Sequence, residues 1–207
     1  MSNIVKAKVK IRGVRPLLQH RFTEASLPLE KQERTGVAGN DPEEWRKSAM
    51  ITKDGQLFID SSYIFATLRA GAKYTKKGKG SIQLDVSATL QVLDGKVLLD
   101  RFMPNYPNGK DFDIAKAEPP PRDENEPVFM DVRSVKNPST KGRNLRYRVA
   151  ASAGWECEFN ILWDKTLVNR SQMEAVVIDS GVLVGLADGR SIGYGRFEIV
   201  YFEQSED

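Results

Sequence analysis

Alternating apolar and polar residues mark several stretches of the chain as β-strands. In the first stretch, residues 5–11, Val5, Ala7, Val9 and Ile11 alternate with Lys6, Lys8, Lys10 and Arg12. Successive side chains of a strand point to opposite faces, so this stretch predicts one apolar face and one wholly basic face. The other stretches with apolar positions two residues apart are 84–92, which continues at 97–99, then 128–132, 157–163 and 197–201.

Two further stretches have the three- and four-residue spacing of amphipathic helices. Asp60, Ser61 or Ser62 can cap the first helix, whose apolar positions are Ile64, Phe65, Leu68 and Ala72, before Gly78 and Gly80 end it. Ser171 is the expected cap of the second helix, which carries Met173, Val176, Val177 and Val184. Between the strands, Asp94-Gly95 predicts a hairpin turn.

Three segments predict loops. Residues 21–54 have no sustained period beyond one short helix around 42–49, and residues 100–127 contain prolines that a central strand does not accept. Residues 136–148 are expected to form a basic loop between two strands. The remaining order, β-α-β-β-α-β, predicts an α+β fold with the ferredoxin-like arrangement of RNA-recognition domains. A chain of 207 residues favours one domain, 1–207, with insertions at 21–54 and 100–127.

Bulk composition excludes several classes of protein. The sequence has neither an apolar run long enough to cross a bilayer nor a signal peptide, which predicts a protein that stays in the cytoplasm without a membrane partner. Cys157 is the only cysteine and is expected to be buried, and His20 is the only histidine, so no metal site is expected. The absence of a Walker A motif and of a dinucleotide glycine pattern predicts no nucleotide cofactor.

Positive charge is concentrated in a few segments, although the net charge is only +3. Residues 69–84 hold five Lys and Arg residues and no acid, and residues 131–148 hold six against Asp131 alone. Each segment by itself is also typical of a solvated surface. Their coincidence favours contacts to nucleic-acid phosphates by His20, Arg21, Arg69, Lys73, Lys76, Lys77, Lys79, Arg133, Lys136, Arg143, Arg146, Arg148, Arg190 and Arg196, with Tyr74, Tyr147 and Tyr194 placed to stack on bases.

The stretch from Gly185 to Arg196 contains four glycines and two arginines between a helix pattern and the last strand. Glycine allows a positive φ and a close approach of the backbone to a ligand, and backbone amides beside Arg190 and Arg196 suit a phosphate. Glycines also end helices and turn chains, so a purely structural role is the alternative.

Residues 155–202 run from Trp-Glu-Cys-Glu-Phe-Asn-Ile-Leu-Trp through a helix to this glycine- and arginine-rich loop and a strand. This segment resembles the C-terminal half of the RAMP superfamily, the RNA-binding proteins of CRISPR effector complexes. Residues 55–73 resemble the strand and helix of the same proteins, and residues 13–20 and 133–135 resemble a group of phage-encoded relatives. The resemblance covers roughly two thirds of the chain.

The resemblance implies a protein that binds single-stranded RNA or DNA along its phosphates, without catalysis, and that assembles side by side into a filament. It implies that residues 21–54 and 100–127 touch neighbouring subunits and clamp the strand, and that other CRISPR-type subunits are candidate partners. The chain is smaller than typical backbone subunits, which leaves a CRISPR effector and phage nucleic-acid metabolism both open.

Two alternative functions remain. Some RAMP relatives cut RNA with a histidine, which makes His20 the candidate general acid or base of a metal-independent ribonuclease. Another subgroup uses an aspartate after the first strand; Asp41 lies in that region, but its surroundings are equally typical of a turn and helix cap. The third reading is an interaction protein that mimics a CRISPR subunit and obstructs assembly.

Overall fold

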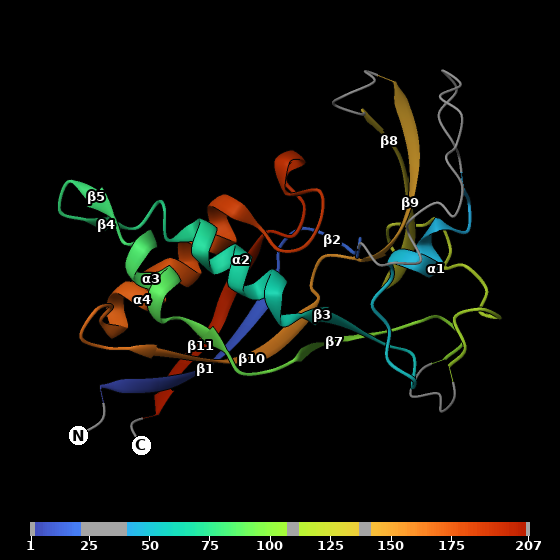
Figure 1. The fold of residues 1–207 in the computed structure, drawn as a ribbon. Helices are drawn as coiled ribbons and strands as arrows, with labels where there is room; N and C mark the ends of the chain where they lie inside the picture. The colour runs from blue at the N-terminus through green and yellow to red at the C-terminus, as the bar shows by residue number, and fades with distance from the viewer. Residues whose placement is uncertain (1–2, 22–40, 107–111, 137–141, 206–207) are drawn as a thin grey trace, which may run out of the picture.

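The computed structural model describes residues 3–21, 41–106, 112–136 and 142–205. In these residues the largest sheet is antiparallel and has the order β11-β1-β10-β7-β3, with β6 also paired to β10 (Figure 1). Its strands are β1 (Ile4–Gly13), β3 (Gln56–Asp60), β6 (Gln91–Val92), β7 (Lys96–Phe102), β10 (Glu156–Asp164) and β11 (Phe197–Ser205).

Two helices, α2 (Ser61–Gly71) and α4 (Arg170–Asp179), cover one face of this sheet and leave the other face open (Figure 1). In chain order β1, α2, β6 with β7, β10, α4 and β11 form the β-α-β-β-α-β series, and the strand order places the first and third strands of the series in the centre. The predicted α+β, ferredoxin-like fold is therefore confirmed.

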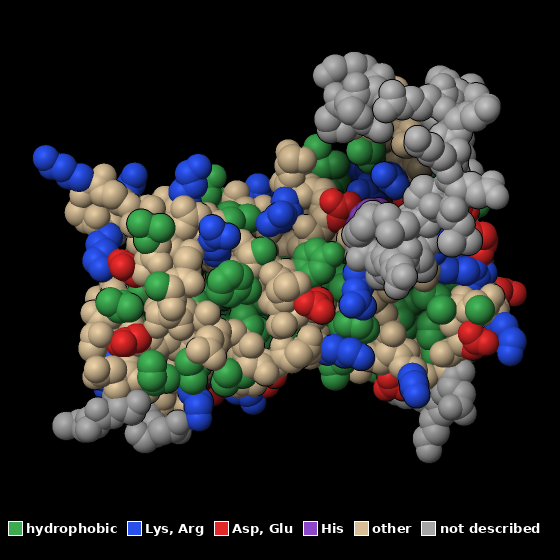
Figure 2. Space-filling view, viewed as in Figure 1, with side chains coloured by type: hydrophobic (Ala, Val, Ile, Leu, Met, Phe, Trp, Pro, Cys, Tyr) green, Lys and Arg blue, Asp and Glu red, His purple; other side chains and the backbone are tan. Residues whose placement is uncertain are grey.

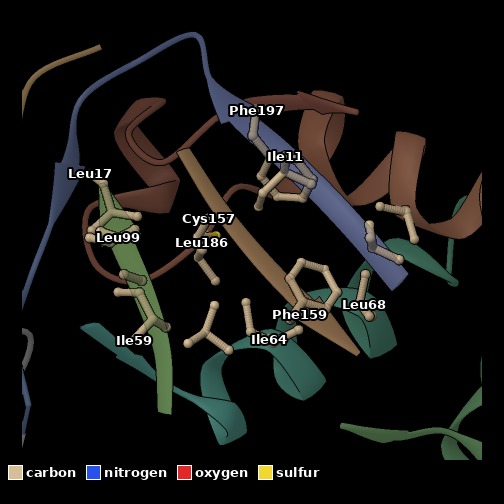
Figure 3. Close-up of a cluster of buried hydrophobic side chains, with 14 of the residues drawn as sticks. Ile11, Leu17, Ile59, Ile64, Leu68, Leu99, Cys157, Phe159, Leu186 and Phe197 are labelled. Atoms are coloured by element: carbon tan, nitrogen blue, oxygen red, sulfur yellow. The ribbon is translucent and has the colours of Figure 1, made fainter. Parts of the chain in front are cut away.

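The core lies between the sheet and the helices because the apolar face of each strand points inward. Ile11 and Phe159 from neighbouring strands meet Ile64 and Leu68 of α2, and all four side chains are at most 2% exposed (Figure 3). Cys157 is buried in the same cluster, as predicted, and burial raises the pKa of its thiol.

Helix caps follow the sequence with one shift. The Asp60 side chain accepts a hydrogen bond from the Ser62 amide at 3.0 Å and caps α2, as expected. Asn169 rather than Ser171 caps α4. The Asn169 side chain accepts a hydrogen bond from the Gln172 backbone amide at 2.9 Å, and the Gln172 side chain accepts one from the Asn169 backbone amide. Helix α4 then continues as the π-helical turn η2 (Ser180–Val184).

A second, three-stranded sheet stands beside the first and has the order β2-β9-β8. Its strands are β2 (Leu17–Leu18), β8 (Val128–Lys136) and β9 (Arg143–Ala151), and the short helix α1 (Glu44–Ser48) packs on β9. The prediction of a loop over residues 136–148 is wrong at Lys136, which ends β8, and from Arg143 onward; residues 137–141 lie outside the described residues. The period-2 pattern of Leu145, Tyr147 and Val149 continues the strand, and the arginines between them obscured it.

The predicted strand at 84–92 is also wrong: residues Gln83–Thr89 form helix α3, and only Gln91 and Val92 of this stretch form a strand. Ile82, Val86 and Leu90 are buried at four-residue intervals, whereas Leu84 is 83% exposed. The alternation of apolar residues in this stretch therefore does not reflect a strand. The packing of Ile82, Val86 and Leu90 on one side of the segment stabilises a helix instead. Before α3, strands β4 (Lys76–Lys77) and β5 (Gly80–Ser81) form a small hairpin.

Asp94-Gly95 does not turn a hairpin, because β6 and β7 both pair with β10 and not with each other. The Asp94 carboxylate instead accepts hydrogen bonds from the backbone and side-chain amides of Asn160, at 2.5 and 3.2 Å. It fills the break between the two short pairings on β10. None of the helices within the described ranges is both long and apolar enough to span a bilayer.

Candidate nucleic-acid interface

An open groove of about 1010 Å³ lies between the β8–β9 hairpin, the end of α2 and the loop of residues 185–196. It brings together cations from three separate basic segments and one acid, Asp188. Figure 2 shows blue side chains, with the histidine and acidic side chains among them, where the β8–β9 end meets the body of the molecule. The predicted residues that line the groove are His20, Lys73, Tyr74, Arg133, Lys136, Arg146, Arg148, Arg190 and Arg196.

The other predicted contacts do not line this groove. Lys76, Lys77 and Lys79 lie on or beside the β4–β5 hairpin, which projects from the opposite end of the molecule from β8 and β9 (Figure 1). The Lys77 ammonium group is paired with Asp85 at 2.7 Å. Arg21, Arg69, Arg143, Tyr147 and Tyr194 are likewise absent from the groove lining.

Arg148 lines the groove, but its charge is used in ion pairs within the protein. Its side chain is 4% exposed and reaches Asp131 at 2.9 Å and Asp188 at 2.7 Å. Burial alone would raise the pKa of Asp188, but the hydrogen bonds from Arg148 and the Gly189 amide hold this pKa below its usual value. Because Arg148 joins β9 to β8 and to the loop, it fixes the width of the groove.

Arg133 is also partly neutralised. Its Nε donates to Asp131 at 2.6 Å, and its guanidinium lies 4.7 Å from the centre of the Tyr194 ring. Burial would lower the pKa of Arg133, but the hydrogen bond and charge of Asp131 raise it overall. Arg133 therefore remains cationic while holding Tyr194 against Leu18, Phe129 and Ala150.

A second ion cluster joins α1 to β9 at the mouth of the groove. The Glu44 carboxylate pairs with Arg146 and accepts a hydrogen bond from the Tyr147 amide at 3.2 Å. The His20 Nε2 atom lies 3.6 Å from the same carboxylate. The sequence offered no sign of this cluster, since its members come from three elements that lie far apart along the chain.

Four groove cations have no carboxylate within ion-pair distance among the residues that the structure describes: Lys73, Lys136, Arg190 and Arg196. Lys73, Lys136 and Arg190 are exposed. In the same described set, the buried Nη1 atom of Arg196 has no hydrogen-bond partner. These side chains are the part of the groove that is best suited to meet an anionic strand.

The glycines of the loop are needed for close packing within the protein. A Cβ on Gly195 would lie 1.9 Å from the Leu186 carbonyl oxygen, and one on Gly185 would lie 2.5 Å from that of Tyr194. The Gly193 and Gly195 amides donate to Arg190 O at 3.1 Å and Pro16 O at 2.8 Å. These amides do not point at a ligand, so phosphate contacts in this loop fall to the arginine side chains.

The three tyrosines differ in their surroundings. Tyr74 is 49% exposed and lines the groove, which leaves its ring open to a base. Tyr147 packs against the main core with Arg122 over its ring, 5.9 Å from the ring centre. Tyr194 has Arg133 over one face, as described above.

The basic face predicted for the first strand is neutralised on the open side of the sheet. Lys8 pairs with Glu158 at 2.8 Å, and Lys10 and Arg12 pair with Glu156 at 2.7 and 2.6 Å. The hydrogen bonds from Lys10 and Arg12 lower the pKa of Glu156. We call the surface of these five residues the outer sheet face. Its two carboxylates offset most of the positive charge of its three cations.

The remaining chemical candidates are ordinary structural groups. Asp41 accepts a hydrogen bond from the Glu43 amide at 3.0 Å and pairs with Lys47 at 3.1 Å, as a turn and cap residue does. Within the described ranges no cluster of three or more His, Cys, Asp or Glu side chains could hold a metal ion.

Comparison with solved structures finds a likeness in fold. The chain is similar in fold to a chain of the Type III-B Cmr-beta complex, solved by cryo-EM bound to cognate target RNA, with a TM-score of 0.51 and 13% sequence identity. The match covers 98% of this chain but only 61% of that chain. No protein-family model matches the sequence. No curated protein matches it either. At 13% identity, the likeness concerns the fold alone.

Proposed function

We propose that this protein is a RAMP-type subunit that binds single-stranded nucleic acid, RNA in the first place, along its phosphates in the groove and without catalysis. The observation that carries the proposal is the convergence of Lys73, Lys136, Arg190 and Arg196 on one open groove. The fold is similar to that of a subunit chain in a complex bound to target RNA, which favours RNA over single-stranded DNA.

The groove suits a phosphate backbone better than a small metabolite. It is open and lined by flexible cations, whereas small-molecule sites are enclosed and mostly apolar. Exposed side chains such as Tyr74 and Ile192 lie beside the cations and can contact bases that are not paired. Nothing in this arrangement reads a base sequence, so binding is expected to be independent of sequence.

The test is binding of unstructured oligonucleotides at several salt concentrations. Each phosphate contact should contribute a slope of about −0.7 to the logarithm of the affinity against that of the salt concentration. Replacing Arg190 by Ala should weaken binding to all sequences by about fivefold and leave the melting temperature unchanged. Affinity that does not respond to salt would reject the proposal.

We further propose that copies assemble head to tail. The exposed lysines of the β4–β5 hairpin lie at one end of the molecule, and residues 118–127 lie at the other (Figure 1). The latter segment carries Glu118, Asp123, Glu124 and Glu126 against Arg122 alone. Opposite charges at opposite ends favour a heterologous contact, which leaves a free end at each step and generates an open filament.

Charge reversal tests this assembly. Reversing Lys76, Lys77 and Lys79 to Glu, or Asp123, Glu124 and Glu126 to Lys, should each abolish oligomers, and both sets together in one chain should restore them. Mass photometry at low salt, with and without a long oligonucleotide, gives the readout. If the combined variant stays monomeric while the native chain assembles, other surfaces form the contact.

A ribonuclease is the second candidate, because His20 lies in the groove beside Glu44. An imidazole can exchange a proton with the 2′-hydroxyl that attacks a phosphate. Incubation with a hairpin RNA in the presence of a chelator decides between the two. Cleavage that is lost in His20→Ala would favour the enzyme, and intact RNA under conditions of tight binding would favour the binding protein.

A further inference from the structure

The only histidine of the chain lies at a fixed point of the groove. Its backbone is held on three sides: the Tyr63 hydroxyl donates to His20 O at 3.0 Å, and the neighbouring amides of Gln19 and Arg21 donate to Val149 O and Ser48 O. The imidazole is 27% exposed and lines the groove. A change in its charge therefore acts at a defined position relative to a bound strand.

Charged groups from four parts of the fold surround this ring. Glu44 of α1 lies 3.6 Å from Nε2 and is shared with Arg146 of β9. Asp188 of the 185–196 loop interacts electrostatically with His20 and is paired with Arg148 of β9. Arg190 of the loop lines the same groove, the Tyr63 hydroxyl of α2 donates to His20 O, and Arg21 is next in the chain.

In the free protein these charges oppose one another. Both carboxylates favour a protonated imidazole, but each already accepts a hydrogen bond from an arginine, and the arginines repel a further positive charge. A phosphate strand in the groove adds negative charge without adding cations. The protonated form of His20 is therefore favoured more strongly in the protein with a bound strand than in the free protein.

We infer that the groove takes up one proton on His20 when it binds a nucleic-acid strand, so that the affinity rises as the pH falls. This inference rests on the proposed function. A protonated imidazole also competes with Arg146 for Glu44, which releases that guanidinium toward phosphate. The change in affinity is sought between about pH 8 and pH 5.5, the range in which a histidine side chain can change its charge.

Thermodynamic linkage sets the size and sign of the effect. If the strand binds the protein with a protonated imidazole about tenfold more tightly than the protein with a neutral one, affinity at low pH exceeds affinity at high pH by about tenfold. Reciprocally, binding takes up at most one proton at this site. The effect therefore has a fixed ceiling that proton counting can check.

The experiment measures binding of a 5′-hydroxyl oligouridine from pH 5.5 to 8. This ligand has neither a terminal phosphate nor a base that titrates in this range. Native protein should bind about tenfold tighter at pH 5.5 than at pH 8. His20→Gln should keep the weaker affinity at every pH, and His20→Lys should keep the tighter one. Thermal unfolding at each pH checks that all three proteins remain folded.

A second readout does not depend on the variants. With a single histidine, the imidazole C–H resonances report one titration, which should move to higher pH in the presence of the oligonucleotide. An unchanged titration, or pH dependence that persists in His20→Gln, would overturn the inference while leaving the proposed function intact. Failure to bind the oligonucleotide at any pH would reject the proposed function itself.

Discussion

The outer sheet face and the groove are both formed by segments rich in Lys and Arg. The two surfaces differ in how many of these cations have a carboxylate partner. On the outer sheet face, Arg12 and Lys10 of β1 lie directly opposite Glu156 and Glu158 of β10, and short ion pairs to these two carboxylates offset most of the positive charge. In the groove, Lys73, Lys136 and Arg190 remain without a neighbouring carboxylate among the described residues. A count of cations along the chain does not measure the surface potential.

The two regions also differ in how much the fold depends on their ion pairs. The pairs of the outer sheet face are exposed, and such pairs contribute little to stability. In the groove, Arg148 and Asp131 are buried, where the loss of one partner leaves a desolvated charge. The groove therefore combines one structural arginine with several cations that remain available to a ligand.

The largest expected effect concerns this buried arginine. Arg148→Met should lower the free energy of unfolding by about 3 kcal/mol, because Asp188 loses its partner and Asp131 keeps only Arg133. Lys8→Met on the outer sheet face is the matched change and should leave the midpoint of chemical denaturation nearly unchanged. Equal losses in the two variants would mean that burial does not distinguish the two regions.

Affinity for the oligonucleotide should depend on the exposed cations of the groove, not on the buried arginine. Replacing Lys73, Lys136 and Arg190 together by Gln should weaken oligonucleotide binding by about 100-fold at low salt and reduce the salt slope by about 2. Replacing Lys8, Lys10 and Arg12 by Gln removes the same charge and should change affinity less than about twofold. Fluorescence anisotropy at several salt concentrations measures both. A comparable loss in the second variant would place the strand on the open sheet.

Removing acids from the outer sheet face should make that surface bind. Glu156→Gln combined with Glu158→Gln releases Lys8, Lys10 and Arg12, so a second, weaker site should appear whose affinity falls steeply with salt. The expected stoichiometry in a titration at low salt rises from one strand segment per protein toward two. A stoichiometry that stays the same would show that charge alone does not create a binding surface on this fold.

The smallest effect concerns acid stability. Because the pKa of Asp188 is lower in the folded protein, its contribution is present above the ordinary carboxyl pKa near 4 and is lost as the pH falls through the folded value. Asp188→Asn should therefore flatten the loss of stability below about pH 4, by less than about 1 kcal/mol because the side chain is 41% exposed. High salt should weaken the contribution of Glu156 to the free energy of unfolding more than that of Asp188. Urea denaturation from pH 2.5 to 6, at low and at high salt, measures both contributions.

Local patterns predicted the elements that bury one regular face. The first strand, α2, α4 and the last strand follow directly from their apolar periods. Asp60, one of the three residues expected as a cap, caps α2. Predictions were wrong where the apolar residues fit both a two-residue and a four-residue spacing. Residues 83–89 alternate in sequence but form a helix that packs through Ile82, Val86 and Leu90. Residues 143–151 alternate as a strand, but their arginines resembled a solvated loop.

For the interface, the sequence by itself determined the types of residue and the three basic segments, because charge and side-chain chemistry are properties of each residue. Only the tertiary structure decided which cations meet an acid. Glu156 pairs with both Lys10 and Arg12 across 144 or more residues of chain, and Asp188 pairs with Arg148 across 40. Arg190 pairs with neither of these carboxylates. Coulomb interactions depend on distance and burial in space, and strand register and helix packing set both.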